Sequence, residues 1–209
     1  VLMAKLGNVL ILTGIFLTPF TYADGDLSKG QTLYNVCIAC HGDKGQGNAP
    51  LRAPRLAGQE PWYIKAMIRK FKAGLRGTDP KDTYGAQMRA MSFGLVNDQA
   101  IDDVVAFIGT LQTTTPPDLI EGDATKGKSY YIMCTACHGM NGQGNSGLKA
   151  PKLQDQHGWY LYDQIQAFKK GWRGSDPSDA SGVQMKAMAF TLPNDQAIKD
   201  VVAHIQTLK

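Results

Sequence analysis

Two short motifs contain every cysteine of the chain, and each motif ends in a histidine. They read Cys37-Ile38-Ala39-Cys40-His41 and Cys134-Thr135-Ala136-Cys137-His138. The Cys-x-x-Cys-His pattern is typical of covalent haem attachment. On a helix, two thiols one turn apart can each form a thioether to a porphyrin vinyl group, and the adjacent histidine then becomes a ligand of the iron. The sequence therefore predicts two covalent haem c groups, with His41 and His138 as proximal ligands.

Cysteine pairs with this spacing have three other common uses. A zinc site could combine one pair from each motif, but it would leave both histidines without a role. A thioredoxin-type redox pair comes with alternating strands and helices, which this sequence does not predict. A structural disulfide would not require a histidine after each pair. Haem attachment is the interpretation that uses every residue of both motifs.

The two motifs belong to a longer internal repeat. A constant offset of 97 residues, as between Cys37 and Cys134, relates the copies without a gap from about Lys29 to Leu111. Segment 112–118, rich in threonine and proline, predicts an extended and fairly stiff linker. The predicted organisation is a signal peptide over 1–23, a first domain over 24–112, a linker over 113–123 and a second domain over 124–209.

Each copy is predicted to be helical. Asp26 or Ser28 could cap a helix that runs into the first cysteine pair, Glu60–Ala73 forms a second helix, and Asn97 caps a third. Asn194 caps the equivalent helix of the second copy. No stretch alternates like a strand, so the predicted fold class is all-α. Domains of this size have thin cores, which a buried haem would fill.

Electron carriers usually hold haem iron with a second axial ligand, and methionine is a common one. Two methionine pairs recur in both copies: Met88 with Met91, and Met185 with Met188. Spacing alone does not choose between the members of a pair. His157 and His204 have no histidine at the equivalent position, so a haem with two histidine ligands is not expected.

The chain resembles the dihaem cytochrome c4 family, in which two cytochrome c domains stand in tandem. The resemblance covers nearly all of the chain after residue 23, including both Cys-x-x-Cys-His motifs, segment 53–59 and the Met-x-x-Met segments that end at Leu95 and Leu192. It implies two cytochrome c-like domains, each wrapped around one covalent haem. In the family, the axial methionine lies seven residues before that leucine, which implies Met88 and Met185 as ligands. Met91 and Met188 would then line the haem pockets.

The resemblance also suggests roles for two further repeated pairs. Pro54 and Pro151 match the proline whose carbonyl accepts a hydrogen bond from the proximal histidine. Arg76 and Arg173 are either partners of the haem propionates or solvated arginines that follow a helix. The sequence leaves these two interpretations open.

The function implied is electron transfer rather than enzyme catalysis, because both axial positions would be filled. Expected partners are a quinol-oxidising complex or a cupredoxin as donor and a terminal oxidase as acceptor. One alternative is the cytochrome subunit of a larger dehydrogenase, for example a flavocytochrome. A small dihaem redox enzyme is another, and it would need one open or unusually ligated iron.

The first 23 residues have the features of a secretory signal. Lys5 is their one charged residue, an apolar run covers 9–20, and Thr21-Tyr22-Ala23 offers small residues for cleavage after Ala23. The predicted location is the periplasm, with a loose or anchored membrane association if the segment is retained. The formal net charge is +4 with no basic stripe, so nucleic-acid binding is not expected.

Overall fold

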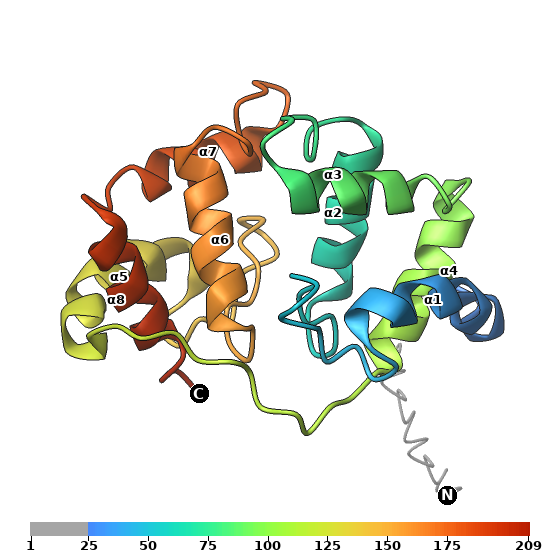
Figure 1. Cartoon of the computed structure of the whole chain (residues 1–209), viewed down its shortest axis with the longest axis horizontal. Coiled ribbons are helices and arrows are strands. Elements are labelled where there is room, and N and C mark those ends of the chain that lie inside the picture. Colours follow the sequence, from blue (N-terminus) through green and yellow to red (C-terminus); the bar gives the residue numbers. More distant parts are fainter. Residues whose placement is uncertain (1–24) are drawn as a thin grey trace, which may run out of the picture.

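The structure, a computed structural model, describes residues 25–209, and the predicted signal peptide lies outside them. The first half contains α1 (Leu27–His41), α2 (Pro61–Lys72), α3 (Thr83–Ser92) and α4 (Asp98–Thr110). The second half contains α5 (Ala124–His138), α6 (Gly158–Lys169), α7 (Ala180–Ala189) and α8 (Asp195–Ile205). Each helix of the second half begins 97 residues after its counterpart (Figure 1). No strand occurs within 25–209, which confirms the predicted all-α class.

Short polar side chains fix the starts of several helices. Asp26 accepts hydrogen bonds from the backbone N–H groups of Ser28 and Lys29, so it is the cap of α1 and Ser28 is not. Asn97 and Asn194 cap α4 and α8, as the sequence predicts. A side-chain acceptor at this position satisfies backbone donors that have no partner within the helix.

Two differences from the predicted helices concern the middle of each half. The second helix spans Pro61–Lys72 rather than Glu60–Ala73, because proline fits the first helical position, where no N–H partner is needed. The methionine pairs were not assigned to a helix, yet α3 carries Met88 and α7 carries Met185. In each half, this additional helix carries both members of the methionine pair.

The tightest packing in each half joins its first and last helices. A Cβ atom added to Gly30 of α1 would lie 2.0 Å from the Asp103 carbonyl oxygen of α4. The same atom on Gly127 of α5 would lie 1.9 Å from the carbonyl oxygen of Asp200 in α8. Only glycine therefore permits these crossings, and the helices that end in the two Cys-x-x-Cys-His motifs are held directly against the C-terminal helix of each half.

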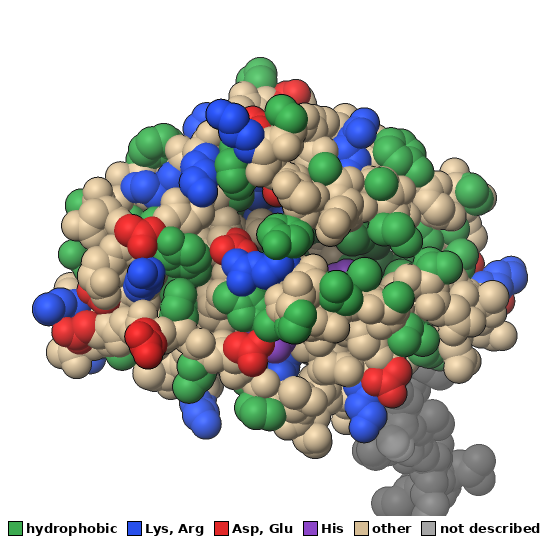
Figure 2. Space-filling view, viewed as in Figure 1, with side chains coloured by type: hydrophobic (Ala, Val, Ile, Leu, Met, Phe, Trp, Pro, Cys, Tyr) green, Lys and Arg blue, Asp and Glu red, His purple; other side chains and the backbone are tan. Residues whose placement is uncertain are grey.

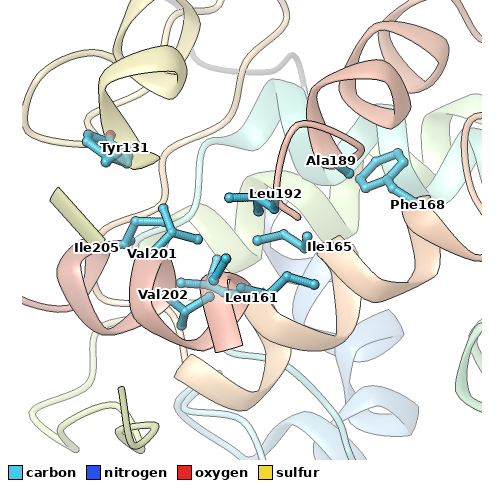
Figure 3. Packing of buried hydrophobic residues seen from close by; sticks show 11 residues of the cluster. Tyr131, Leu161, Ile165, Phe168, Ala189, Leu192, Val201, Val202 and Ile205 are labelled. Carbon is cyan, nitrogen blue, oxygen red and sulfur yellow. The ribbon is translucent and has the colours of Figure 1, made fainter. Parts of the chain in front are cut away.

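Each half has its own hydrophobic core. In the second half, Val202 of α8 lies next to Leu161 of α6, and Ile205 of α8 lies on the side nearer Tyr131 of α5 (Figure 3). The equivalent cluster in the first half centres on residues of α2 and α4 that are almost fully buried. The two clusters are separate, as expected for tandem domains.

The two halves meet through their middle helices. In Figure 1, α2 and α3 lie beside α6 and α7, while α1 with α4 and α5 with α8 occupy opposite ends. Residues 111–121 form no helix and run along one side of both halves as an extended connection. Within 25–209, no helix is both long enough and apolar enough to cross a membrane.

Candidate functional site

The four cysteines lie on the final turns of two equivalent helices. Cys37 and Cys40 belong to α1, which ends at His41, and Cys134 and Cys137 belong to α5, which ends at His138. All four thiols are free. The alternative of a structural disulfide within each motif is therefore not supported. Both thiols of each pair remain available for thioether bonds on one helix, next to a histidine.

The first thiol of each pair also lacks the lowered pKa of zinc-binding or redox-active cysteines. Burial raises the pKa of Cys37 to about 11 and that of Cys134 to about 11 as well. Zinc-binding and redox-active cysteines are thiolates with a lowered pKa. The two pairs lie on α1 and α5, helices of different halves (Figure 1), and no group of three or more potential metal-binding His, Cys, Asp or Glu side chains occurs within 25–209.

The two motif histidines are held in the same way. Nδ1 of His41 lies 2.8 Å from the carbonyl oxygen of Pro54, and Nδ1 of His138 lies 2.8 Å from that of Pro151. Because a carbonyl only accepts, Nδ1 carries the proton and donates it. The predicted role of the two prolines is thereby confirmed. In a neutral imidazole, the Nε2 lone pair is then free to bind a metal.

Burial keeps these imidazoles neutral. His41 and His138 are 8% and 7% exposed. Burial lowers the pKa of His41, against a smaller opposing effect of the hydrogen bond to Pro54. It also lowers the pKa of His138, where the Pro151 hydrogen bond and the charge of Glu60 act in the opposite direction. Both histidines are thus suited to bind iron through Nε2.

The methionine pairs differ in exposure. On α3, Met88 is half-buried whereas Met91 is 51% exposed. On α7, Met185 packs against the hydrophobic cluster of the second half, and Met188 is half-buried. These surroundings favour Met88 over Met91 as an inward-facing sulfur ligand. Met185 and Met188 differ less in burial, so exposure distinguishes them less clearly.

Arg76 and Arg173 are buried, so the interpretation as solvated arginines is wrong. Each guanidinium lies over a phenylalanine ring of its own half, 4.3 Å from the centroid of Phe71 or Phe168. The Nε atoms of both arginines are buried without a hydrogen-bond partner among the described residues. Buried charged donors without an acceptor are costly, and an anion beside these two Nε atoms would satisfy them.

The electrostatics around these arginines indicate the same need. Burial and the neighbouring charge of Arg76 lower the pKa of Arg173. Burial tends to raise the pKa of Tyr63, but the positive charges of Arg173, Arg76 and Lys70 outweigh it and hold this pKa below its usual value. Positive charge thus accumulates between the two halves. The carboxylates of haem propionates fit it in sign and in hydrogen-bonding capacity.

Comparisons with known proteins agree with this geometry. The family model described as Cytochrome c matches residues 27–112 and again 124–209. Cytochrome c4 of Azotobacter vinelandii is 32% identical over 205 residues, which cover 93% of each chain. The chain belongs to the cytochrome c4 family. As a protein with two cytochrome c domains, this cytochrome carries two covalently bound haem c groups.

The fold of this cytochrome matches a solved structure and its sequence matches a further group of relatives. The reduced recombinant cytochrome c4 from Pseudomonas stutzeri superposes with a TM-score of 0.70 at 30% identity, covering 88% of this chain and 100% of that one. A protein of Stutzerimonas stutzeri named thiosulfate dehydrogenase electron acceptor is 29% identical over 168 residues, or 74% of this chain and 72% of the relative.

Several interface residues of this cytochrome were not predicted. Nε2 of Gln59 donates to the Lys152 carbonyl at 3.1 Å, and Nε2 of Gln156 donates to the Arg55 carbonyl at 3.0 Å. The two glutamines occupy equivalent positions, and so do the two carbonyls. The same contact therefore occurs twice, once with the glutamine of the first half and once with that of the second. The recurrence of this glutamine was the available signal, but sequence shows only that a residue recurs and not what it contacts.

The histidines that do not recur have structural partners. Nδ1 of His157 accepts from the backbone N–H of Asp118 at 2.9 Å, and its Nε2 therefore donates to the Gln46 carbonyl at 2.8 Å. The His204 ring packs against that of Tyr131, with centroids 5.3 Å apart. Both nitrogens of His157 are thus engaged, Nδ1 with the linker and Nε2 with the first half.

Proposed function

We propose that this cytochrome is an electron carrier and not an enzyme. Cys37 and Cys40 would hold the first haem and Cys134 and Cys137 the second, with domains spanning 24–112 and 124–209 and a linker over 113–123. The carrying observation is the hydrogen bond from each motif histidine to a proline carbonyl, because it leaves Nε2 of His41 and His138 free for iron.

Met88 and Met185 are proposed as the second axial ligands, and Met91 and Met188 as residues that line the pockets. The greater exposure of Met91 supports the choice in the first domain. The contact of Met185 with the hydrophobic cluster supports it in the second. A thioether stabilises Fe(II) and so raises the reduction potential.

The bound haem iron supplies an Fe(III)/Fe(II) couple that exchanges one electron without making or breaking bonds. The proline carbonyls hold the two imidazoles in one orientation, so the ligands need little rearrangement when the charge changes. His41 with Met88, and His138 with Met185, would hold the iron and leave no position on it for small molecules. Arg76 and Arg173 supply buried N–H donors for carboxylates.

The proposed partners are redox proteins: a quinol-oxidising complex or a cupredoxin as donor and a terminal oxidase as acceptor. On the face in Figure 2, positive and negative side chains are interspersed with exposed hydrophobic ones. Such a surface suits transient protein contacts and does not suit nucleic acid. The proposed location is the periplasm, with a loose or anchored membrane association if segment 1–23 is retained.

A second candidate function is that of the electron-accepting cytochrome of a dehydrogenase. The relative named thiosulfate dehydrogenase electron acceptor, which this chain matches over 74% of its length, favours it. The haem chemistry would be unchanged and only the donor would differ. Co-purification with a dehydrogenase subunit, and reduction of the cytochrome by that subunit's substrate, would favour this candidate over a free carrier.

Optical spectra of the purified protein test the proposed function. We expect two equivalents of covalent haem per chain and, in the oxidised state, the weak red absorption band of methionine–Fe(III) charge transfer from both. Cyanide should bind slowly, because it must displace a ligand. One equivalent of haem, or immediate cyanide binding at either iron, would contradict the proposal.

Replacement of Arg76 by glutamine is expected to lower the reduction potential of the nearer haem. A positive charge beside a haem favours Fe(II), and its loss should change the redox equilibrium constant about threefold at a moderate effective dielectric. Redox titration measures this shift. The matched control is Arg69→Gln, which removes an exposed arginine that pairs with Asp98. Equal shifts in both variants would show that Arg76 has no special relation to a haem.

A further inference from the structure

The peptide that follows each histidine-binding proline is hydrogen-bonded to the opposite domain. In the first domain, the N–H of Arg55 donates to Oε1 of Gln156 at 3.1 Å. In the second domain, the equivalent N–H of Lys152 donates to Oε2 of Glu60 at 2.9 Å. The same peptide position therefore meets a neutral amide in one domain and a carboxylate in the other.

The carbonyl group of each of these peptides also accepts a hydrogen bond from the proximal histidine. The carbonyl of Pro151 accepts from His138 at 2.8 Å, and the N–H of the same peptide unit donates to Glu60. One peptide group therefore separates the Glu60 carboxylate from the imidazole. In the first domain, the corresponding peptide links His41 to Gln156.

The local structure directs the Glu60 side chain to this position. Glu60 precedes α2, but its side chain forms no capping bond, and its own N–H is bonded to Oε1 of Gln59 at 2.9 Å. A Cβ on Gly144 would lie 3.0 Å from Oε2 of Glu60, and the φ of +84° at Gly144 also disfavours a side chain. The equivalent of Glu60 is His157, which contacts the Gln46 carbonyl instead. The carboxylate thus has no counterpart beside the first haem.

A carboxylate that accepts from a peptide N–H polarises that peptide, so its carbonyl oxygen becomes a stronger acceptor. The hydrogen bond from the His138 Nδ1–H is strengthened in turn, and the imidazole becomes a more basic ligand. A more basic ligand favours Fe(III), as does the negative charge itself. Both effects lower the reduction potential of the haem that His138 binds.

We propose that Glu60 is a positioning residue for the haem of the other domain, which it acts on through the Pro151–Lys152 peptide and His138 to lower that haem's reduction potential. The proposal rests on the proximal ligands of the proposed function. The two haems have the same attachment motif, and a contact at the domain interface would make their reduction potentials differ. Glu60 favours placing the single electron of the half-reduced protein on the first haem.

The variant Glu60→Gln tests this proposal in the holoprotein. Glutamine keeps an acceptor for the Lys152 N–H and removes the charge. NMR signals of each haem's methyl groups, assigned through contacts to Cys37 or Cys134, report the reduced fraction of each haem during a redox titration. We expect the electron distribution to shift toward the second haem by about threefold or more. The reciprocal variant Gln156→Glu places a carboxylate on the peptide that holds His41, so it should lower the potential of the first haem and also shift the electron toward the second.

Glu121→Gln is the matched control, because it removes an exposed carboxylate of the linker. Thermal unfolding of both variants reports whether the interface is retained. If Glu60→Gln shifts the distribution no more than Glu121→Gln while both methionine–iron bands remain, Glu60 is only structural and the proposal is wrong. Absent methionine–iron bands in the unmodified protein would instead refute the axial ligation of the proposed function.

Discussion

Replacing Met88 or Met185 by alanine is expected to lower the reduction potential of the haem in the same domain by about 0.1 V or more, within the roughly 0.8 V range that axial ligands cover. The thioether stabilises Fe(II), and water or an empty position does not. Each variant should also lose the methionine charge-transfer band of one haem and bind cyanide quickly there. Redox titration and optical spectra of the two variants measure these effects.

The neighbouring methionines provide matched controls. Met91→Ala and Met188→Ala remove the same side chain one helical turn away on α3 and α7. We expect both to keep the charge-transfer band and to change the potentials far less. The result that would reverse the assignment is a lost band in Met91→Ala or Met188→Ala together with an intact one in its partner variant.

The attachment residues could be predicted from sequence because their geometry is local. Two cysteines and a histidine within five residues, on one helix, hold the same relation in any surroundings. The axial methionines could not be chosen in this way, because both members of each pair lie on one short helix, separated by a single turn. Only the resemblance to a family preferred Met88 and Met185, and only the fold shows that Met91 is largely exposed.

The interface could not be predicted, because it depends on which surfaces of the two copies meet. Arg76 follows a helix in a segment rich in glycine, and nothing in that segment indicates burial. Arg76 is nevertheless buried, and its hydrogen bond to Oε1 of Gln164, at 3.0 Å, comes from the opposite domain. The residue equivalent to Gln164 is Met67, whose sulfur lies 3.6 Å from Nη2 of Arg173. Oε1 of Gln164 also accepts from Nη1 of Arg173 at 2.5 Å, so the two arginines share this glutamine, and Met67 is a partner of Arg173 alone.

Because equivalent residues can have different contacts, an internal repeat does not show which contacts each copy forms. Recurring residues such as Gln59 and Gln156 form equivalent contacts, and they hold the domains in a nearly symmetrical arrangement. Residues that differ between the copies, such as Glu60 and His157, then face equivalent places with different chemistry. The shared residues build two similar haem sites, and the differing residues at the interface are where their properties can diverge.

The second large effect is expected at the helix crossing that supports each attachment motif. Gly30→Ala should destabilise the first domain by about 3 kcal/mol, because the new methyl group would meet the backbone oxygen of Asp103 at 2.0 Å and force α1 from α4. Alanine gains about 1 kcal/mol of helix propensity over glycine, which is too little to offset this overlap. Gly127→Ala should act alike on α5 and α8. Denaturant unfolding followed by circular dichroism measures both.

Gly109→Ala is the control, since it makes the same replacement within α4 at a place with room. There the nearest atom to an added Cβ is Cγ of Pro61 at 3.7 Å, an ordinary contact. This variant should be as stable as the parent protein or up to about 1 kcal/mol more stable. Equal stability of Gly30→Ala and Gly109→Ala would mean that α1 and α4 can separate without loss. The close crossing would then not be what holds the haem-attachment helix in position.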